Sequence, residues 1–294
     1  MTLLSKQEIS QFLSVIDRVS EAERNKIFAL LEMDRVQRCQ ESYLFFVRQM
    51  WPGFISGRHH QIMADAFERV ADGSLKRLII NMPPRHTKSE FASYLLPSWF
   101  LGKFPEKKII QTAHTAELAV GFGRKVRNLV QSDQYAKVFD TKLSSDSKAA
   151  GRWNTHKGGD YFAIGVGGAV TGKGADLLII DDPHSEQEAK QGNPAVFDGV
   201  YEWYTSGPRQ RLQPGGAIIV VMTRWSKKDL TGQILKGSER DGSDQWEVIE
   251  FPAILPSGNP LWPGFWAKEA LESLKAELPV AKWEAQYQQN PISE

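Results

Sequence analysis

Five short apolar runs, separated by helix-like segments, constrain the fold more than any other feature of this chain. They lie at residues 78–82, 109–113, 176–180, 217–222 and 246–251. The runs do not alternate with polar residues and are rich in β-branched side chains, which is typical of strands buried on both faces. Amphipathic patterns at residues 61–70, 89–101 and 116–132 predict helices between them. Strands alternating with helices predict a mostly parallel sheet covered by helices.

The ends of the chain have a different pattern and are expected to be helical. "SKQE" (Ser5 to Glu8) and "SEAE" (Ser20 to Glu23) both match the capping box, in which a Ser and a Glu satisfy each other's backbone donors. The tail at residues 266–289 also has a helical pattern. The sequence therefore predicts helical additions before and after the sheet.

Composition excludes several classes of protein. Of 294 residues, 41% are hydrophobic and 24% charged, so the chain can bury a substantial core. The net charge of +1 indicates no overall basic field for nucleic acid, which leaves a basic stripe on one face as an open alternative. One cysteine, Cys39, excludes an internal disulfide, and the scattered histidines lack zinc spacing. With no signal-peptide core and no apolar run near about 20 residues, we expect a cytoplasmic protein without a membrane span.

The stretch "LIINMPPRHTKSE" (Leu78 to Glu90) has the outline of a phosphate-binding loop without its glycines. In the usual pattern, G-x-x-x-x-G-K-[ST], glycines turn backbone N–H groups toward the phosphates, the Lys reaches the outer phosphates, and the hydroxyl binds Mg²⁺. Lys88 and Ser89 occupy the last two places, at an expected helix N-terminus. Thr87 stands where the final glycine belongs. The alternative is a solvated turn with a surface lysine.

A second segment, "DLLIIDDPH" (Asp176 to His184), is an apolar strand ending in two adjacent carboxylates, Asp181 and Asp182. At such a strand end one acid holds Mg²⁺ and its neighbour orients or deprotonates the attacking water. An Asp-Asp turn is the simpler alternative. The combination of this strand with an earlier Lys-Ser loop favours a site for ATP and Mg²⁺.

A third strand, "AIIVVMTRW" (Ala217 to Trp225), ends in Thr223 and Arg224. The carboxyl ends of parallel strands face the ligand in folds of this kind. Thr223 is therefore expected to sense the γ-phosphate or its water. The alternative is a capped turn, because "SKKD" (Ser226 to Asp229) would cap the following helix.

Together, "NMPPRHTKSE", "TGKGADLLIIDDPH" and "MTRWSKKDLTG", in this order, resemble the ATPase domain of tailed-phage terminase large subunits, the DNA-packaging motor. The resemblance covers nearly all of the chain after about residue 40. It implies a RecA-like, ASCE-type P-loop NTPase, with a mostly parallel sheet flanked by helices. It also implies an additional strand between the two nucleotide motifs, which residues 109–113 match. Implied partners are double-stranded DNA, a homo-oligomeric, pentameric ring on a portal, and the small terminase subunit, in the host cytoplasm.

The resemblance divides the chain into three parts. Residues 1–50 are expected to form an N-terminal helical segment, 51–252 the P-loop ATPase core, and 253–294 a C-terminal lid or linker. Complete large subunits also carry a C-terminal nuclease with clustered acids, which we expect to be absent here. An isolated motor domain of this kind is either a truncated or a split protein, and both alternatives stay open.

The resemblance also implies roles for individual residues. Lys88 and Ser89 are expected to bind phosphate and Mg²⁺, and Asp181 to support the metal. Asp182 stands at the position of the catalytic acid, where many relatives have the longer Glu, and Glu186 is the fallback base. The other loop residues expected to contact the nucleotide are Pro84, Arg85, His86 and Thr87.

Three further residues have competing interpretations. Gln61 falls where an adenine-contacting Gln is expected, and a surface helical Gln explains it equally well. Arg85 is a candidate for stabilising the γ-phosphate charge in cis. Lys173, in the glycine-flanked "TGKG", is the candidate for a finger reaching a neighbouring subunit, although Lys lacks the guanidinium's bidentate fork. The alternative for Lys173 is an ordinary lysine in a flexible loop.

Two other functions remain open at this point. A helicase-like ATPase would need a second RecA-like domain, for which the remaining residues offer no further set of strands. A nucleotide-dependent assembly or scaffold protein would bind ATP and hydrolyse it weakly. The Asp at position 182 and the Lys at position 173 are the features that favour this second alternative.

Overall fold

An eight-stranded sheet forms the centre of the computed structural model, which describes residues 3–190 and 193–292. The strand order is β3-β4-β5-β2-β6-β7-β1-β8. Neighbours from β5 to β8 run parallel, and β4 runs antiparallel to both β3 and β5. The strands are β1 (Arg77–Asn81), β2 (Lys108–Ala113), β3 (Leu143–Ala149), β4 (Arg152–Thr155), β5 (Asp160–Gly165), β6 (Ala175–Asp181), β7 (Leu212–Met222) and β8 (Glu247–Glu250). The predicted fold class, a mostly parallel sheet flanked by helices, is confirmed.

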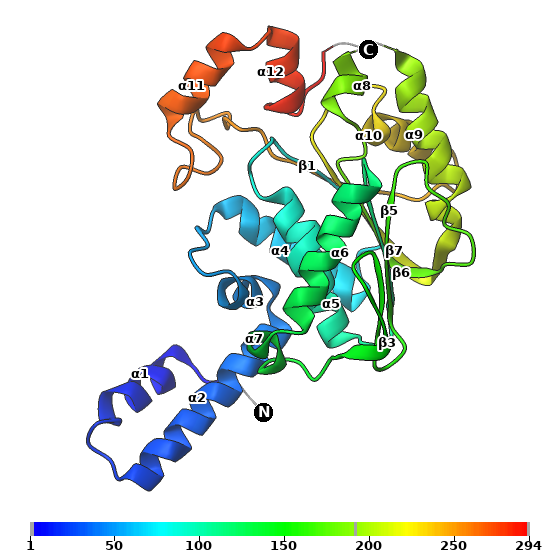
Figure 1. Ribbon diagram of the computed structural model, residues 1–294. Helices are drawn as coiled ribbons and strands as arrows, with labels where there is room; N and C mark the ends of the chain where they lie inside the picture. The colour runs from blue at the N-terminus through cyan, green and yellow to red at the C-terminus, as the bar shows by residue number, and fades with distance from the viewer. Residues whose placement is uncertain (1–2, 191–192, 293–294) are drawn as a thin grey trace.

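Helices cover both faces of the sheet (Figure 1). One face packs against α3 (Tyr43–Met50), α4 (Arg58–Asp72), α5 (Leu96–Lys103) and α6 (Ala116–Val130), and the other against α9 (Pro194–Ser206) and α10 (Leu230–Ser238). In β1, Leu78 and Ile80 belong to the first core and Ile79 to the second. Burial on both faces explains why the apolar runs do not alternate.

All five apolar runs are strands, but the sequence analysis missed β3, β4 and β5. β3 has the sequence LSSDSKA, and β4 has exposed and half-exposed positions between its buried ones. Strands of this kind, at the outer edge of a sheet, carry no continuous apolar signal. β3 pairs with β4, β4 with β5, and β5 with β2, so this part of the sheet is set by tertiary contacts.

The expected strand at residues 109–113 is β2, which lies between the two nucleotide motifs in the sequence. In the sheet β2 lies on the far side of β6, and the strand between β1 and β6 is β7. Residues Ile218–Val221 of β7 pair with β1 on one side and β6 on the other. The end of β7, where Thr223 follows, therefore lies between the loops after β1 and β6.

The N-terminal segment begins with α1 (Lys6–Val15) and α2 (Glu21–Glu41), which start at the two predicted capping boxes. α1 and the first part of α2 project away from the body of the molecule (Figure 1). The end of α2 and all of α3 pack into the main core, where Cys39, Tyr43 and Phe46 are fully buried. The predicted division at residue 50 stays a proposal.

The C-terminal segment contains α11 (Lys268–Glu277) and α12 (Val280–Gln286), so the predicted helical tail is interrupted at Leu278 and Pro279. A residue before proline is biased away from the helical conformation. Ala253, Leu271 and Trp283 form a small apolar cluster of their own. The remaining helices are η1 (Glu90–Leu95), α7 (Asp133–Ala136), α8 (Glu186–Lys190) and η2 (Pro208–Arg211). Within residues 3–190 and 193–292, no helix is long and apolar enough to cross a membrane.

Candidate active site

The loop between β1 and the next helix, residues 82–89, is the candidate phosphate loop. Arg85 and Thr87 have φ angles of 61° and 72°. This left-handed conformation is ordinarily occupied by glycine, and for a β-branched residue such as Thr it costs on the order of 1–3 kcal/mol. The loop thus adopts the backbone turn of a glycine-rich loop without a glycine.

The carboxylate of Asp181, at the end of β6, lies at the start of the helix that follows this loop. Ser89 Oγ donates to Asp181 Oδ1 at 3.0 Å, and Ser93 Oγ donates to Oδ2 at 2.7 Å. Gln111 Nε2 in turn donates to Ser93 Oγ at 2.9 Å. Burial, reinforced by the charge of Asp182, raises the pKa of Asp181 to about 7. A cation at this carboxylate would therefore relieve an unfavourable buried charge.

Ser93 and Gln111 are site residues that the sequence analysis missed. Ser93 lies in η1, a π-helical turn in which the Leu96 N–H bonds to the Phe91 carbonyl, five residues back. Such turns are frequent at functional sites. The spacing of Ser89 and Ser93, four residues apart on one helix, is the signal that would have identified Ser93, because residues at that spacing share a face.

Asp182, the next carboxylate, pairs with Lys88. Lys88 Nζ lies 2.8 Å from Asp182 Oδ2, and the Thr223 backbone N–H donates to Oδ1 at 2.9 Å. Thr223 Oγ1 donates to the Met82 carbonyl at 3.0 Å, which ties the end of β7 to the loop after β1. The Lys88 side chain is buried, unlike the lysine of a solvated turn. The structure thus brings together five of the predicted residues: Lys88, Ser89, Asp181, Asp182 and Thr223.

Arg224 is buried next to this edge of the sheet. Its Nε bonds to both carboxylate oxygens of Asp229, at 3.2 and 2.9 Å, and Asp229 caps α10 as the "SKKD" pattern predicted. The Arg224 N–H donates to Gln289 Oε1 at 3.1 Å. The C-terminal segment is therefore bonded to the strand end that carries Thr223.

A cavity of about 620 Å³ opens beside the candidate phosphate loop. Arg85, Thr87, Lys88, Ser89 and Glu90 line one part of it, and the other part is aromatic. The aromatic residues are Trp51, Trp262, Phe265 and Trp266. The volume lies in the range typical of small-molecule sites. Such sites usually combine an apolar or aromatic wall with a small number of polar groups.

Three predicted loop and nucleotide residues occupy other positions. His86 is buried, and its Nδ1–H donates to the Pro84 carbonyl at 2.8 Å, so both contribute to the loop's internal bonding. Neither is among the residues that line the cavity. Gln61 is exposed on α4 and donates to Asp65 at 2.7 Å. An adenine contact by Gln61 stays a prediction.

The candidate charge-stabilising residues, Arg85 and Lys173, and the fallback base, Glu186, have different surroundings. Arg85 is exposed and lines the cavity. Glu186, in α8, pairs with Lys282 of α12 at 2.7 Å. Lys173 pairs with Asp160 at 2.9 Å, and its ammonium lies 5.0 Å from the Phe162 ring centroid. Its side chain is only 11% exposed and is paired within the chain, and the role of Lys173 as a finger stays a prediction.

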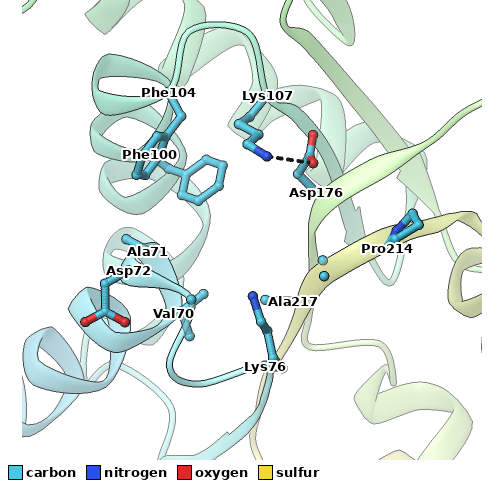
Figure 2. Close-up of a pocket in the computed structure, with 13 residues that line it drawn as sticks. Val70, Ala71, Asp72, Lys76, Phe100, Phe104, Lys107, Asp176, Pro214 and Ala217 are labelled. Atoms are coloured by element: carbon cyan, nitrogen blue, oxygen red, sulfur yellow. Dashed lines mark hydrogen bonds and ion pairs between the residues drawn. The ribbon is translucent and has the colours of Figure 1, made fainter.

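Asp160 begins β5, whereas Asp181 ends β6, so Lys173 lies at the opposite edge of the sheet from the site. A second cavity also opens at that edge, where Lys76 and Lys107 point into it and Lys107 bonds to Asp176 at 3.3 Å (Figure 2). Asp176 and Asp181 are separated by about 16 Å at the usual rise of a strand. This second cavity is therefore separate from the candidate active site.

The residues present fit Mg²⁺. In the part of the chain that the structure describes, no cluster of three or more His, Cys, Asp or Glu side chains is arranged to hold a metal. Mg²⁺ in nucleotide sites is instead held by one or two carboxylates, substrate phosphates and water. Ser89 Oγ and Asp181 Oδ1, 3.0 Å apart, would supply the hard oxygen ligands of such a site.

The architecture matches solved structures. The ATPase domain of the Thermus phage P74-26 large terminase aligns with a TM-score of 0.52 and 14% identity, over 84% of this chain and 97% of that one. The HK97 bacteriophage large terminase aligns with a TM-score of 0.56 and 14% identity, over 85% of this chain and 55% of that one. This is the fold of phage large-terminase ATPase domains. The chain spans about half the length of the HK97 terminase, and it has the RecA-like terminase architecture. Comparison of the sequence with family profiles and with curated proteins finds no match.

Proposed function

We propose that this chain is a Mg²⁺-dependent ATP hydrolase, the motor domain of a phage terminase large subunit. The observation that carries the proposal is the bond between Ser89 and Asp181, formed beside a buried Lys88 at the C-terminal edge of the sheet. It joins the helix after β1 to the end of β6, the two places where P-loop enzymes carry their phosphate and metal ligands. The terminase fold supports the same assignment.

Each residue has a chemical task in this proposal. Lys88 and the N–H groups of the candidate phosphate loop bind the outer phosphates, and Arg85 adds positive charge at the cavity wall. Ser89 and Asp181 hold Mg²⁺, which when bound neutralises charge on the phosphates. Asp182 orients the attacking water and accepts its proton after phosphate has drawn Lys88 away from it. Thr223 is bonded to Asp182 and to Met82, so it couples the change in the partner of Asp182 to the end of β7.

The aromatic part of the cavity favours a nucleotide over an inorganic phosphate. Trp262 and Phe265 are stacked with ring centroids 4.4 Å apart, and Phe265 remains 53% exposed. An exposed ring beside a phosphate site is a stacking surface for a base, since every base has a π-face. The position of Phe265 and Trp266 in the cavity wall supports the lid role proposed for residues 253–294.

The cellular role rests on the fold and on the sequence resemblance. We infer that hydrolysis drives translocation of double-stranded DNA into a procapsid, by a homo-oligomeric ring on a portal with the small terminase subunit, in the host cytoplasm. A C-terminal nuclease would be a separate part of the same machine. The three-part division at residues 50 and 252 belongs to this proposal.

A nucleotide-dependent scaffold that hydrolyses weakly is the second candidate. Two observations favour it: Asp182 is occupied by Lys88 and Thr223, and Lys173 is occupied by Asp160. Both residues would have to change partners before they took part in turnover. Single-turnover hydrolysis separates the two functions, because a scaffold binds ATP without releasing phosphate at a useful rate.

The first experiment measures Mg·ATP affinity by titration calorimetry and phosphate release for wild type and Lys88→Ala. We expect Lys88→Ala to weaken binding by about tenfold or more, since a charge-assisted contact is lost. Lys107→Ala is the matched control, because Lys107 is also paired with an aspartate but lies at the opposite sheet edge. Wild-type affinity in a folded Lys88→Ala protein would refute the phosphate loop. ATP-driven DNA packaging into procapsids then tests the motor role.

A further inference from the structure

The candidate phosphate loop keeps a left-handed Thr87 directly before Lys88. Threonine does not hold this conformation by its own preference, and such residues persist only where their surroundings over-determine them. The contacts around Thr87 therefore decide whether the backbone N–H groups and Lys88 face a phosphate.

A hydrogen-bond relay reaches Thr87 from α4. The Gly57 N–H donates to His60 Nδ1 at 2.8 Å, and His60 Nε2 lies 2.7 Å from Thr87 Oγ1. Since Nδ1 accepts, the neutral ring carries its proton on Nε2 and donates to Thr87. The Thr87 hydroxyl is then free to donate to the His86 carbonyl, with which it is in contact. The next link, from His86 Nδ1–H to the Pro84 carbonyl, spans 2.8 Å.

The surroundings keep His60 fixed and neutral. The ring is fully buried and stacks on Phe91 at 4.7 Å between centroids, with Trp262 at 5.1 Å and Phe54 at 4.8 Å. Burial lowers the pKa of His60 to about 2, and the nearby His59 adds to this effect. Gly57 admits no side chain, because a Cβ there would lie 2.8 Å from His59 and from Trp262.

We propose that His60 is the positioning residue that holds Thr87 in the left-handed conformation, and so replaces the glycine that such loops otherwise require. His60 touches neither phosphate nor metal. It acts through the Thr87 hydroxyl, which it orients toward the His86 carbonyl. The loop is then held by this bond and by the bond from the His86 ring to the Pro84 carbonyl. This inference rests on the proposed function, since it concerns the same phosphate site.

The relay predicts a specific coupling between two positions. His60→Ala should weaken Mg·ATP binding by about tenfold, the order expected for the loss of one or two buried hydrogen bonds. Thr87→Gly supplies the reference affinity for the second background, because glycine adopts this conformation without help from His60. Adding His60→Ala to Thr87→Gly should then change the affinity by less than about twofold. A residue needed only for packing would weaken binding equally in both backgrounds.

Two controls keep the test decisive. His59→Ala removes a neighbouring buried ring that, among the described residues, is not hydrogen-bonded to Thr87, so its effect should be the same with Thr87 and with Thr87→Gly. Thr87→Val keeps the shape of Thr87 and removes its hydroxyl, and it should lose as much affinity as His60→Ala. If His60→Ala does not fold, the contrast between Thr87→Val and Thr87→Gly carries the test.

The measurement is calorimetric titration of each folded variant with Mg·ATP and with tripolyphosphate, which lacks the base. If Thr87→Gly restores the affinity of His60→Ala for both probes, the result supports His60 as the positioning residue of Thr87. An undiminished loss in the double variant, or wild-type binding by Thr87→Val, overturns it while leaving the proposed function intact. Absence of binding by the wild-type protein would instead refute the proposed function.

Discussion

Asp181 should make the protein less stable at neutral pH when it has no metal, so Asp181→Asn should stabilise the fold. The carboxylate is buried, and burial raises its pKa from 3.8 to about 7. That rise corresponds to a free-energy cost on the order of 4 kcal/mol for ionising the group in the folded protein. An asparagine has the same size and can still form hydrogen bonds with Ser89 and Ser93, but these bonds are weaker than those to a carboxylate. We therefore expect a net gain of about 2 kcal/mol above pH 7.

The sign of the pH dependence follows from linkage. Between the unfolded and folded pKa values of Asp181, the folded protein binds more protons than the unfolded chain. The contribution of Asp181 is thus fully present below about pH 4 and is lost as the pH rises through about 7. The buried histidines act in the opposite direction, because burial lowers the pKa of His59 to about 4, of His60 to about 2 and of His86 to about 4. Their stabilisation is lost as the pH falls from about 6.5 through these values.

The assay must therefore compare two proteins and not two pH values. Urea unfolding of wild type and Asp181→Asn, followed in chelator and without nucleotide from pH 4.5 to 8.5, isolates Asp181 as the difference between the curves. We expect the difference in the free energy of unfolding between the variant and wild type to grow steadily up to about pH 7. We also expect the variant to lose Mg²⁺-dependent binding of the nucleotide. If the difference in unfolding free energy does not change with pH, or if wild type is the more stable protein at pH 8, the pKa of Asp181 is not raised by burial.

Four further predictions concern the other groups of the site. Asp182→Asn should retain ATP binding and lose turnover by about a hundredfold or more, as for a general base; normal phosphate release would exclude that role. Glu186→Gln should keep most of its turnover, because Glu186 is paired with Lys282, and a large loss would move the base to Glu186. Lys173→Ala should leave turnover of dilute protein unchanged, since Lys173 lies at the far sheet edge; a loss at low concentration would contradict its position. Phe265→Ala should weaken ATP binding without affecting tripolyphosphate, and equal losses for both ligands would argue against base stacking.

Local patterns in the sequence determined much of the architecture. Four of the five apolar runs identified strands buried on both faces, and the fifth identified β8, which is half-exposed at the sheet edge. The capping boxes at Ser5 and Ser20 located two helix starts. The sequence also identified Lys88, Ser89, Asp181 and Asp182, which the structure brings together. These features are readable because side-chain periodicity, turn chemistry and strand ends depend on a few neighbouring residues.

Tertiary structure alone decided the partners of these residues. Lys88 is bound to Asp182, Lys173 to Asp160, and Thr87 to His60, and none of these pairs has a spacing that a local pattern reveals. The Lys88–Asp182 pair depends on the order of the strands, with β7 inserted between β1 and β6, whereas His60 reaches Thr87 from α4. Strand order is set by the joint burial of both sheet faces, a property of the whole chain. For that reason residue types indicated the chemistry of the site, whereas the contacts that position those residues came only from the folded molecule.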